Sequence, residues 1–201
     1  MYRSVPPPVL TFELLDDLLF GPEEEIEKKL LEANIFRIGP LVEYALLLNP
    51  DASTSFLKKK RSSESTALSS VLNAGRKRVG NPSFKPLGLE FFKTPKQEAD
   101  FSNPLWIAFR RRLQVASERA GFPKTFAREL AGTFGEMVSN LAEHSERPET
   151  GVVGYRWGKN EFEYVVADQG IGVFKSLRQH RDFKDKVTDY DQALTKVLPN
   201  V

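Results

Sequence analysis

The chain contains no cysteine and only two histidines, His144 and His180. Without thiols it can form no disulfide, supply no thiolate nucleophile and build no cysteine-ligated metal site. Two histidines are also too few for a histidine-rich metal centre. These absences exclude thiol redox chemistry and the common zinc sites before any motif is considered.

The chain also has little net charge and no long apolar run. Its formal charge of +2 is too small to indicate nucleic acid as a general partner. The longest strongly apolar stretch, Leu41–Leu48, is interrupted by Glu43 and is far too short to span a bilayer. Prolines at 6–8 occupy the place where a signal peptide would have its apolar core. We therefore expect a cytoplasmic protein with neither membrane nor nucleic acid as a partner.

What is present is typical of a soluble globular protein. The 201 residues are 40% apolar and 28% charged, and this length suits either one ordinary domain or one domain with a smaller companion unit. Gly21-Pro22 followed by three glutamates predicts a helix start, and Pro40 predicts a second helix that ends at Asn49-Pro50. We expect residues 1–57 to form a small helical N-terminal unit.

Residues 58–83 are basic and rich in serine, and they offer little to bury. Two interpretations are open: a solvated linker or loop, which we favour, and a phosphate-binding patch. Another arginine run, at 110–112, could contact phosphate or an acidic partner, but we favour a solvated helix face.

Residues 84–201 carry the signals of a larger domain. Helices are predicted over 106–120 and from Lys124 or Thr125 to about Ser145, followed by strands over 151–157 and 161–168 and short helices over 173–180 and 189–198. We expect an α/β fold, a two-layer α+β sandwich whose mixed, mainly antiparallel sheet is covered by helices on one face. The predicted buried stripe of the long helix consists of Phe126, Leu130, Phe134, Met137 and Leu141.

A polar line follows the same helix at a spacing of one turn, formed by Glu136, Asn140 and His144. A solvated helix face explains it without function. The functional interpretation is that the Asn140 amide oxygen binds Mg²⁺, while Glu136 accepts a proton from an attacking water.

Asp168-Gln-Gly170-Ile-Gly172 follows the second strand. Such strings are common in strand-exit turns, which is the simpler explanation. In a binding site, the Asp168 carboxylate could accept a hydrogen bond from the exocyclic amine of adenine, and the glycines would let the backbone approach a ligand closely.

The two segments occur in this order with a predicted hairpin between them, and here the chain resembles the GHKL, or histidine-kinase-like, ATPase family with the Bergerat fold. The run Glu136-Met-Val-Ser-Asn140-Leu-Ala-Glu-His144-Ser is similar to the N box of that family, and Val165-Val-Ala-Asp168-Gln-Gly170-Ile-Gly172 is similar to its first glycine box. The resemblance covers about residues 125–180 and is nearest to the bacterial anti-sigma-factor serine kinases.

The resemblance implies ATP and Mg²⁺ as ligands, with residues 84–201 as the ATP-binding domain. By this implication Asn140 coordinates Mg²⁺, Asp168 binds the adenine amine, Gly170 and Gly172 shape the adenine pocket, and Glu136 is the catalytic base. His144 follows the motif, with a packed or capping role as open as a functional one.

The family pattern continues with a lid and a second glycine-rich box, which are not visible here, since residues 173–201 contain no glycine. The domain is therefore expected to be incomplete at its C-terminal side. Two functions remain open: an ATPase or protein serine kinase that transfers phosphate to water or to a protein partner, if the full protein supplies the phosphate loop, and a non-catalytic regulatory or interaction module.

Overall fold

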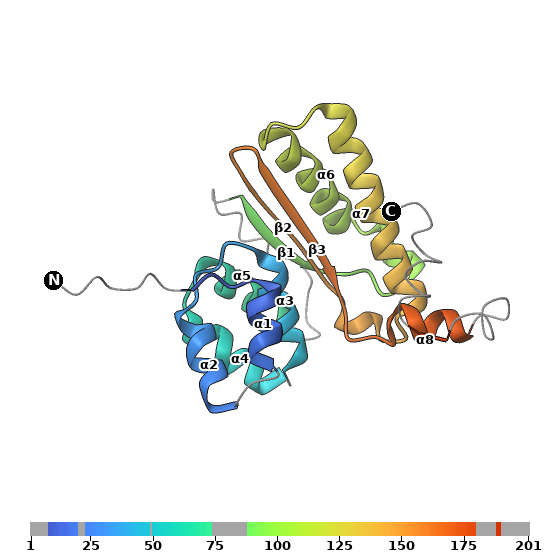
Figure 1. The fold of residues 1–201 in the computed structure, drawn as a ribbon. Coiled ribbons are helices and arrows are strands. Elements are labelled where there is room, and N and C mark those ends of the chain that lie inside the picture. Colours follow the sequence, from blue (N-terminus) through green and yellow to red (C-terminus); the bar gives the residue numbers. More distant parts are fainter. Residues whose placement is uncertain (1–7, 20–22, 49, 74–87, 180–187, 190–201) are drawn as a thin grey trace.

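The computed structural model describes residues 8–19, 23–48, 50–73, 88–179 and 188–189. Within them the chain forms a three-stranded sheet and a set of helices that surround it (Figure 1). The helices are α1 (Phe12–Leu19), α2 (Glu23–Glu32), α3 (Ile38–Leu47), α4 (Pro50–Lys60), α5 (Ser63–Leu72), α6 (Pro104–Arg119), α7 (Lys124–His144) and α8 (Gly172–Gln179), with short 3-10 turns η1 (Glu98–Ser102) and η2 (Pro148–Thr150). None of the helices in these ranges is both long and apolar enough to cross a membrane.

The sheet is antiparallel throughout, in the order β1 (Leu89–Lys93), β2 (Val152–Gly158) and β3 (Glu161–Ala167). Strands β2 and β3 form the predicted hairpin, in which Tyr155 lies opposite Tyr164. The turn contains Asn160 with a φ of 60°, a backbone conformation that asparagine tolerates better than most residues. The prediction of a hairpin at this place is confirmed.

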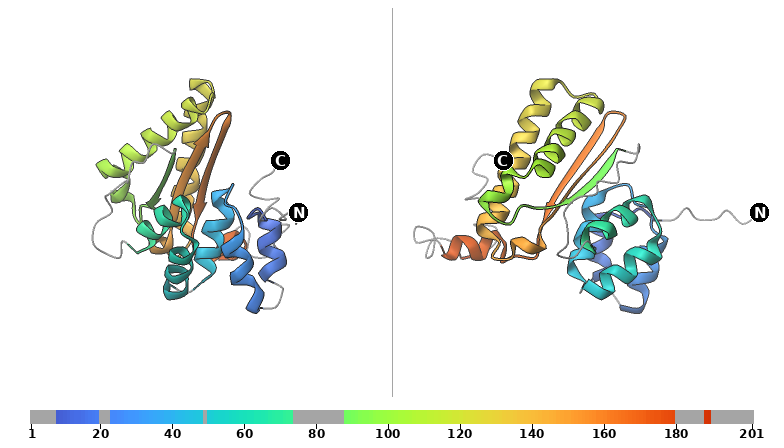
Figure 2. Two further views of the ribbon diagram at one scale, coloured as in Figure 1. Left: turned by 90° about the vertical axis from the view of Figure 1, so that its left-hand side faces the viewer. Right: turned by 180° about the vertical axis from the view of Figure 1, so that it is seen from behind.

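The two faces of the sheet bury two different apolar clusters. Side chains of β1 and β2 on one face pack against α6 and α7, where Trp106, Phe109 and Phe134 form stacked or tilted ring pairs. The other face presents Phe91 and Val152 to the helices of the N-terminal unit. Figure 2 shows α6 and α7 on one side of the sheet and the N-terminal helices on the other.

The predicted α/β fold with a helix-covered, mainly antiparallel sheet is confirmed. One detail differs, because the prediction placed helices on a single face. The helical N-terminal unit does not stand apart from the sheet but covers part of its second face. The reason is that β1 and β2 alternate apolar side chains toward both faces, and each face needs a cover.

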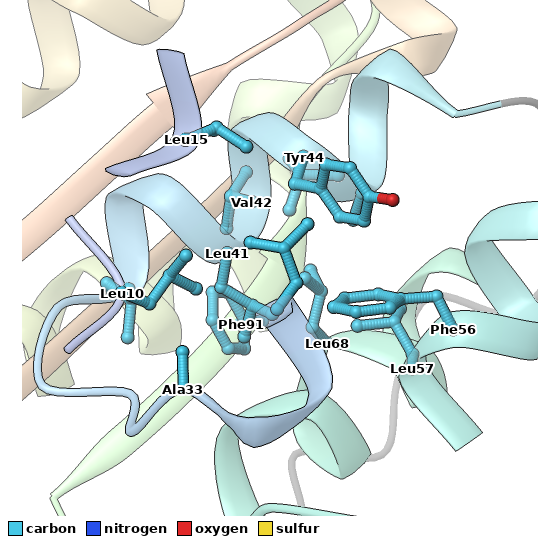
Figure 3. Close-up of a cluster of buried hydrophobic side chains, with 14 residues drawn as sticks. Leu10, Leu15, Ala33, Leu41, Val42, Tyr44, Phe56, Leu57, Leu68 and Phe91 are labelled. Carbon is cyan, nitrogen blue, oxygen red and sulfur yellow. The ribbon is translucent and has the colours of Figure 1, made fainter. Parts of the chain in front are cut away.

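The interpretation of residues 58–83 as a linker or loop is wrong for 58–60 and 63–72, which are helical. Lys58–Lys60 complete α4, and the serine-rich run that follows is the helix α5. Ser62 begins α5 with a capping box, since its hydroxyl accepts from the Ser65 N–H while the Ser65 hydroxyl accepts from the Ser62 N–H. Leu68 anchors α5 with no exposed surface (Figure 3). Residues 74–83 lie outside the described residues.

The helix boundaries before residue 50 agree more closely with those predicted from the sequence. The predicted helices appear as α2 and α3, although α3 begins two residues before Pro40 (at Ile38), and α1 was not predicted. Leu10, Leu15 and Leu41 meet in a common core with residues of α4 and α5 (Figure 3). The predicted helix over 173–180 corresponds to α8, while 190–198 of the predicted last helix lie outside the described residues.

The long helix α7 is present as predicted, but its buried face is rotated. Phe134 and Leu141 are buried as expected, whereas Phe126 and Met137 are 45% and 41% exposed. The buried stripe comprises Ala127, Ala131, Phe134, Val138 and Leu141. Ala131 of this stripe lies in the cluster that packs α7 against α6 and the sheet, and a small side chain at such a contact allows the elements to approach closely.

Two polar links join the N-terminal unit to the sheet. The Glu163 carboxylate on β3 accepts hydrogen bonds from the Ile38 N–H at 3.0 Å and the Gly39 N–H at 3.1 Å. It therefore caps the N-terminus of α3 from another element, where Arg37 provides no side-chain cap. On β2, the Arg156 guanidinium donates to the Phe36 carbonyl at 2.6 Å.

Candidate functional site

The polar line predicted from the sequence lies on the outer surface of α7. Glu136, Asn140 and His144 are all exposed. At about 100° per residue, Glu136 points about 160° away from the buried Phe134. The line does not run parallel to the helix axis, however, and it turns toward β3 along its length. Around the helix, His144 points within about 20° of the direction of Met137. The Met137 sulfur accepts a hydrogen bond from the Tyr164 hydroxyl of β3 at 3.7 Å, so this side of α7 faces β3.

The loop after β3 folds back on itself. Asp168 Oδ1 accepts a hydrogen bond from the Gly170 N–H, which closes a tight turn. Within the described residues the second carboxylate oxygen of Asp168 accepts no hydrogen bond. Asp168 as a whole is half-buried.

The two glycines of this loop serve different purposes. A Cβ atom at Gly170 would lie 2.3 Å from the Ser145 carbonyl oxygen, so the loop rests directly on the end of α7. The contact continues with a hydrogen bond of 3.0 Å from the Ile171 N–H to the same carbonyl. Gly172 has a φ of +71°, which favours glycine, and it begins α8. The sequence predicted that these glycines would let the backbone approach a ligand closely. At Gly170 the backbone instead approaches another part of the protein, the Ser145 carbonyl.

Strand β3 and helix α7 advance side by side in the same direction. They touch at Tyr164 and Met137, and again where Ile171 meets Ser145. From Met137 to Ser145 the helix rises about 12 Å, and from Tyr164 to Asp168 the strand rises about 13 Å. Asp168 and Gly170 therefore lie at the level of the C-terminal end of α7.

This geometry groups the predicted site residues unequally. Along the axis of α7, Asn140 lies about 7.5 Å from Ser145 and Glu136 about 13.5 Å. Asp168, Gly170 and His144 gather at one end, Asn140 follows within two turns, and Glu136 is the most distant. A ligand that contacts all of them would have to be extended along the outer face of α7.

Gln169 holds the loop in place, and the sequence analysis did not single it out. Its backbone N–H donates to the Thr150 hydroxyl at 2.9 Å, and its side-chain amide donates to the Leu46 carbonyl at the end of α3. Arg147 donates to the Gln169 carbonyl at 3.4 Å. These partners are distant in sequence, so no local pattern could have revealed them.

The donor atoms at this site suit a hard cation only in part. In the described ranges no three His, Cys, Asp or Glu side chains gather into a group that could hold a metal ion. Asn140 and Glu136 offer an amide oxygen and a carboxylate, which are ligands of the type Mg²⁺ accepts when phosphates and water supply the remainder. A magnesium ion at Asn140 would thus depend on a phosphate-bearing ligand.

An arginine from α6 reaches the same helix. A Cβ atom built at Gly135 would lie 3.0 Å from Nη2 of Arg110, so the guanidinium rests on α7 beside the residue before Glu136. The helix face that carries Arg110 was interpreted as solvated, and Arg110 is indeed exposed. Its contact with α7 nevertheless places a positive charge on the α6 side of that helix.

Comparison of the chain with protein-family models, with curated proteins and with solved structures found no match.

Proposed function

We propose that the chain contains the adenine- and magnesium-binding part of an ATP-binding domain of the GHKL, or histidine-kinase-like, family. The observation that carries this proposal is the docking of the Asp168–Gly172 loop onto the end of α7, the helix with Asn140. Adenine at Asp168 and phosphates beside Asn140 would then lie in succession along one surface.

Each candidate residue has a defined part in this proposal. The free oxygen of Asp168 accepts from the adenine amine, and Gly170 and Gly172 shape the turn that lines the base. Asn140 contributes an oxygen ligand to Mg²⁺ beside the phosphates. Glu136, farther along the helix, is placed to act as general base toward water or a protein hydroxyl near the outermost phosphate.

In this proposal the reaction is phosphoryl transfer to water or to a serine of a protein partner, in the cytoplasm. Such transfer depends mainly on positioning and on charge stabilisation. The residues named above offer no cluster of backbone N–H groups that could bind the triphosphate. Other parts of the nucleotide-binding surface would have to supply these hydrogen-bond donors.

A second candidate function is a non-catalytic regulatory or interaction module that has kept the fold without nucleotide turnover. It is favoured by the exposure of Glu136 and Asn140 and by the use of one Asp168 oxygen within its own loop. A general base is most effective where water is excluded, which the outer face of α7 does not provide by itself.

Calorimetric titration with ATP in the presence of Mg²⁺ tests the proposal. Asp168→Asn is the sharpest variant, because its amide oxygen can still accept from the Gly170 N–H while the negative charge is lost. We expect saturable binding to the unaltered chain and at least tenfold weaker binding to Asp168→Asn. The control is Asp51→Asn, the same change at an exposed position in α4.

The outcomes separate the two candidates. No binding by any chain would refute nucleotide binding, and equal binding by the unaltered chain and Asp168→Asn would refute the assignment of the site. Binding followed by phosphate release that Glu136→Gln abolishes would support the enzyme. Binding without turnover would favour the regulatory module.

A further inference from the structure

A cavity of about 330 Å³ lies between α6 and the edge of the sheet, away from the site just described. Its floor is formed by the start of β1 and the end of β2, and its wall by one flank of α6. Its volume is at the lower end of the range of small-molecule sites. Residues of α6, β1 and β2 all contribute to its lining.

The base of the cavity is a closed hydrogen-bonded group. Arg112 donates through Nε and Nη2 to the two oxygens of Glu90, at 2.9 and 2.6 Å. The Tyr155 hydroxyl donates to the same carboxylate at 2.8 Å. Because this fork-shaped pairing neutralises Glu90, the one acidic group of the cavity does not repel an anion.

Two further arginines remain available at the rim. Arg111 and Arg119 are exposed, and neither takes part in an ion pair within the described residues. No carboxylate of the described residues therefore holds either guanidinium in a direct ion pair. The cavity presents two guanidinium groups, whose planar donors suit carboxylate and phosphate oxygens.

Between the two arginines the wall is apolar. Val115 lies one helical turn from each of them and is 38% exposed, so it offers apolar surface beside the two guanidinium groups. Trp157 faces the cavity from β2. Its indole is held against Gly88, where a Cβ atom would lie only 2.6 Å from Nε1.

We propose that this cavity binds a small planar organic anion, of the class of aromatic phosphates or carboxylates. The ring would lie against Trp157 and Val115, and the anionic group would be bound by Arg111 and Arg119. The volume suits one ring with one anionic group better than a nucleoside triphosphate. None of Glu136, Asn140 and Asp168 lines the cavity, so this site is separate from the proposed nucleotide site.

Fluorescence titration with phenyl phosphate tests this proposal, because Trp157 faces the cavity while the only other tryptophan, Trp106, is buried in the core. We expect saturable quenching by phenyl phosphate and at least tenfold weaker binding to the double variant Arg111→Gln/Arg119→Gln. The matched control is Arg110→Gln/Arg128→Gln, which removes the same charge from positions that do not line the cavity. Thermal unfolding of each variant verifies that the fold is kept.

The absence of saturable quenching in the folded unaltered chain would overturn the proposal. Equal weakening by both double variants would also overturn it, because it would indicate attraction by net charge alone. Inorganic phosphate should bind at least tenfold more weakly than phenyl phosphate, and equal affinity would contradict the role of the apolar wall. ATP and Mg²⁺ titrated at saturating phenyl phosphate should bind unchanged if the sites are separate. Competition between them would place both ligands in one site and contradict this one.

Discussion

At the scale of single residues, Glu90 is the one charged side chain that is buried in the described part of the chain, with 6% exposure. It is tolerated in β1 because Arg112 and Tyr155 satisfy its two oxygens. Nothing in the local sequence connects these residues, since Arg112 belongs to α6 and Tyr155 to β2. The pairing is a consequence of the helix packing on this face of the sheet.

Replacing Arg112 by methionine should destabilise the fold by about 3 kcal/mol, because it leaves the Glu90 carboxylate buried without its partner. Urea unfolding measures the change. Arg111→Met is the control, because Arg111 is exposed and its replacement should change the free energy of unfolding by less than about 0.5 kcal/mol. Equal effects of the two substitutions would contradict the importance of the buried pair.

The buried environment around Glu90 should also change the pKa of the Tyr155 hydroxyl. Burial raises the pKa of its hydroxyl far above the ordinary value, and the neighbouring Glu90 carboxylate adds to the effect, although Arg112 opposes it. Above about pH 10 the unfolded chain loses this proton while the folded chain keeps it, so this group makes stability fall as pH rises further.

The measurement is urea unfolding of the unaltered chain and of Tyr155→Phe from pH 7 to pH 11. At pH 7 the substitution should cost about 1–2 kcal/mol, since the hydrogen bond to Glu90 is lost. The difference between the two proteins should shrink above about pH 10, because only the chain with Tyr155 carries the linked loss. A difference that stays constant over this range would rule out the raised pKa.

At the scale of elements, α7 shows how a helix can be predicted correctly and its orientation wrongly. The periodicity of apolar residues predicts both the helix and a stripe that includes Phe126 and Met137. Apolar side chains can, however, also occupy helix positions that flank the buried face, as Phe126 and Met137 do. The structure buries Ala127 and Ala131 instead, and Ala131 belongs to the cluster that α7 shares with Trp106, Phe109 and Leu113 of α6.

Alanine substitutions on α7 should distinguish the two stripes. Phe134→Ala should cost about 3–5 kcal/mol, since Phe134 is fully buried among aromatic rings. Met137→Ala should cost less than about 1 kcal/mol, because Met137 is 41% exposed. Chemical unfolding of both variants measures this, and a cost at Met137 equal to that at Phe134 would restore the stripe predicted from the sequence.

At the scale of the whole molecule, the N-terminal helices and the sheet form a joint structure. Apolar packing around Phe91 and Leu68 supplies the contact area (Figure 3). Glu163 adds a directional link, because the carboxylate on β3 caps α3. Gln169 adds another, as its side chain donates to the end of the same helix. The loop with Asp168 is thereby connected to the N-terminal unit.

Glu163→Ala should loosen this junction by about 1–2 kcal/mol, since the first N–H groups of α3 lose their acceptor. Hydrogen exchange should become faster at Ile38 and Gly39, the two residues that donate to Glu163. Glu161→Ala is the control, because Glu161 is exposed and caps no helix in the described part of the chain. Unchanged exchange at α3 in Glu163→Ala would show that the cap contributes nothing to the docking.

The sequence alone determined the features that depend on neighbouring residues. Helical periodicity and its breaks predict α6 and α7, and the turn at Gly158–Asn160 predicts the hairpin. The motifs that suggest nucleotide chemistry are local as well, so Asn140 and Asp168 could be singled out by residue type and spacing. The sequence indicated that the backbone at Gly170 would approach another group closely. It did not indicate that this group would be the Ser145 carbonyl.

Only the tertiary structure decided which of these local features meet. It rotated α7 about its axis, made a packed helix of the serine-rich run at 63–72, paired Glu90 with Arg112 and placed the Asp168 loop against Ser145. The physical reason is that burial and hydrogen bonding join groups remote in sequence, and their free energy depends on the fit between whole elements. A one-dimensional pattern records the propensity of each element but not its partner.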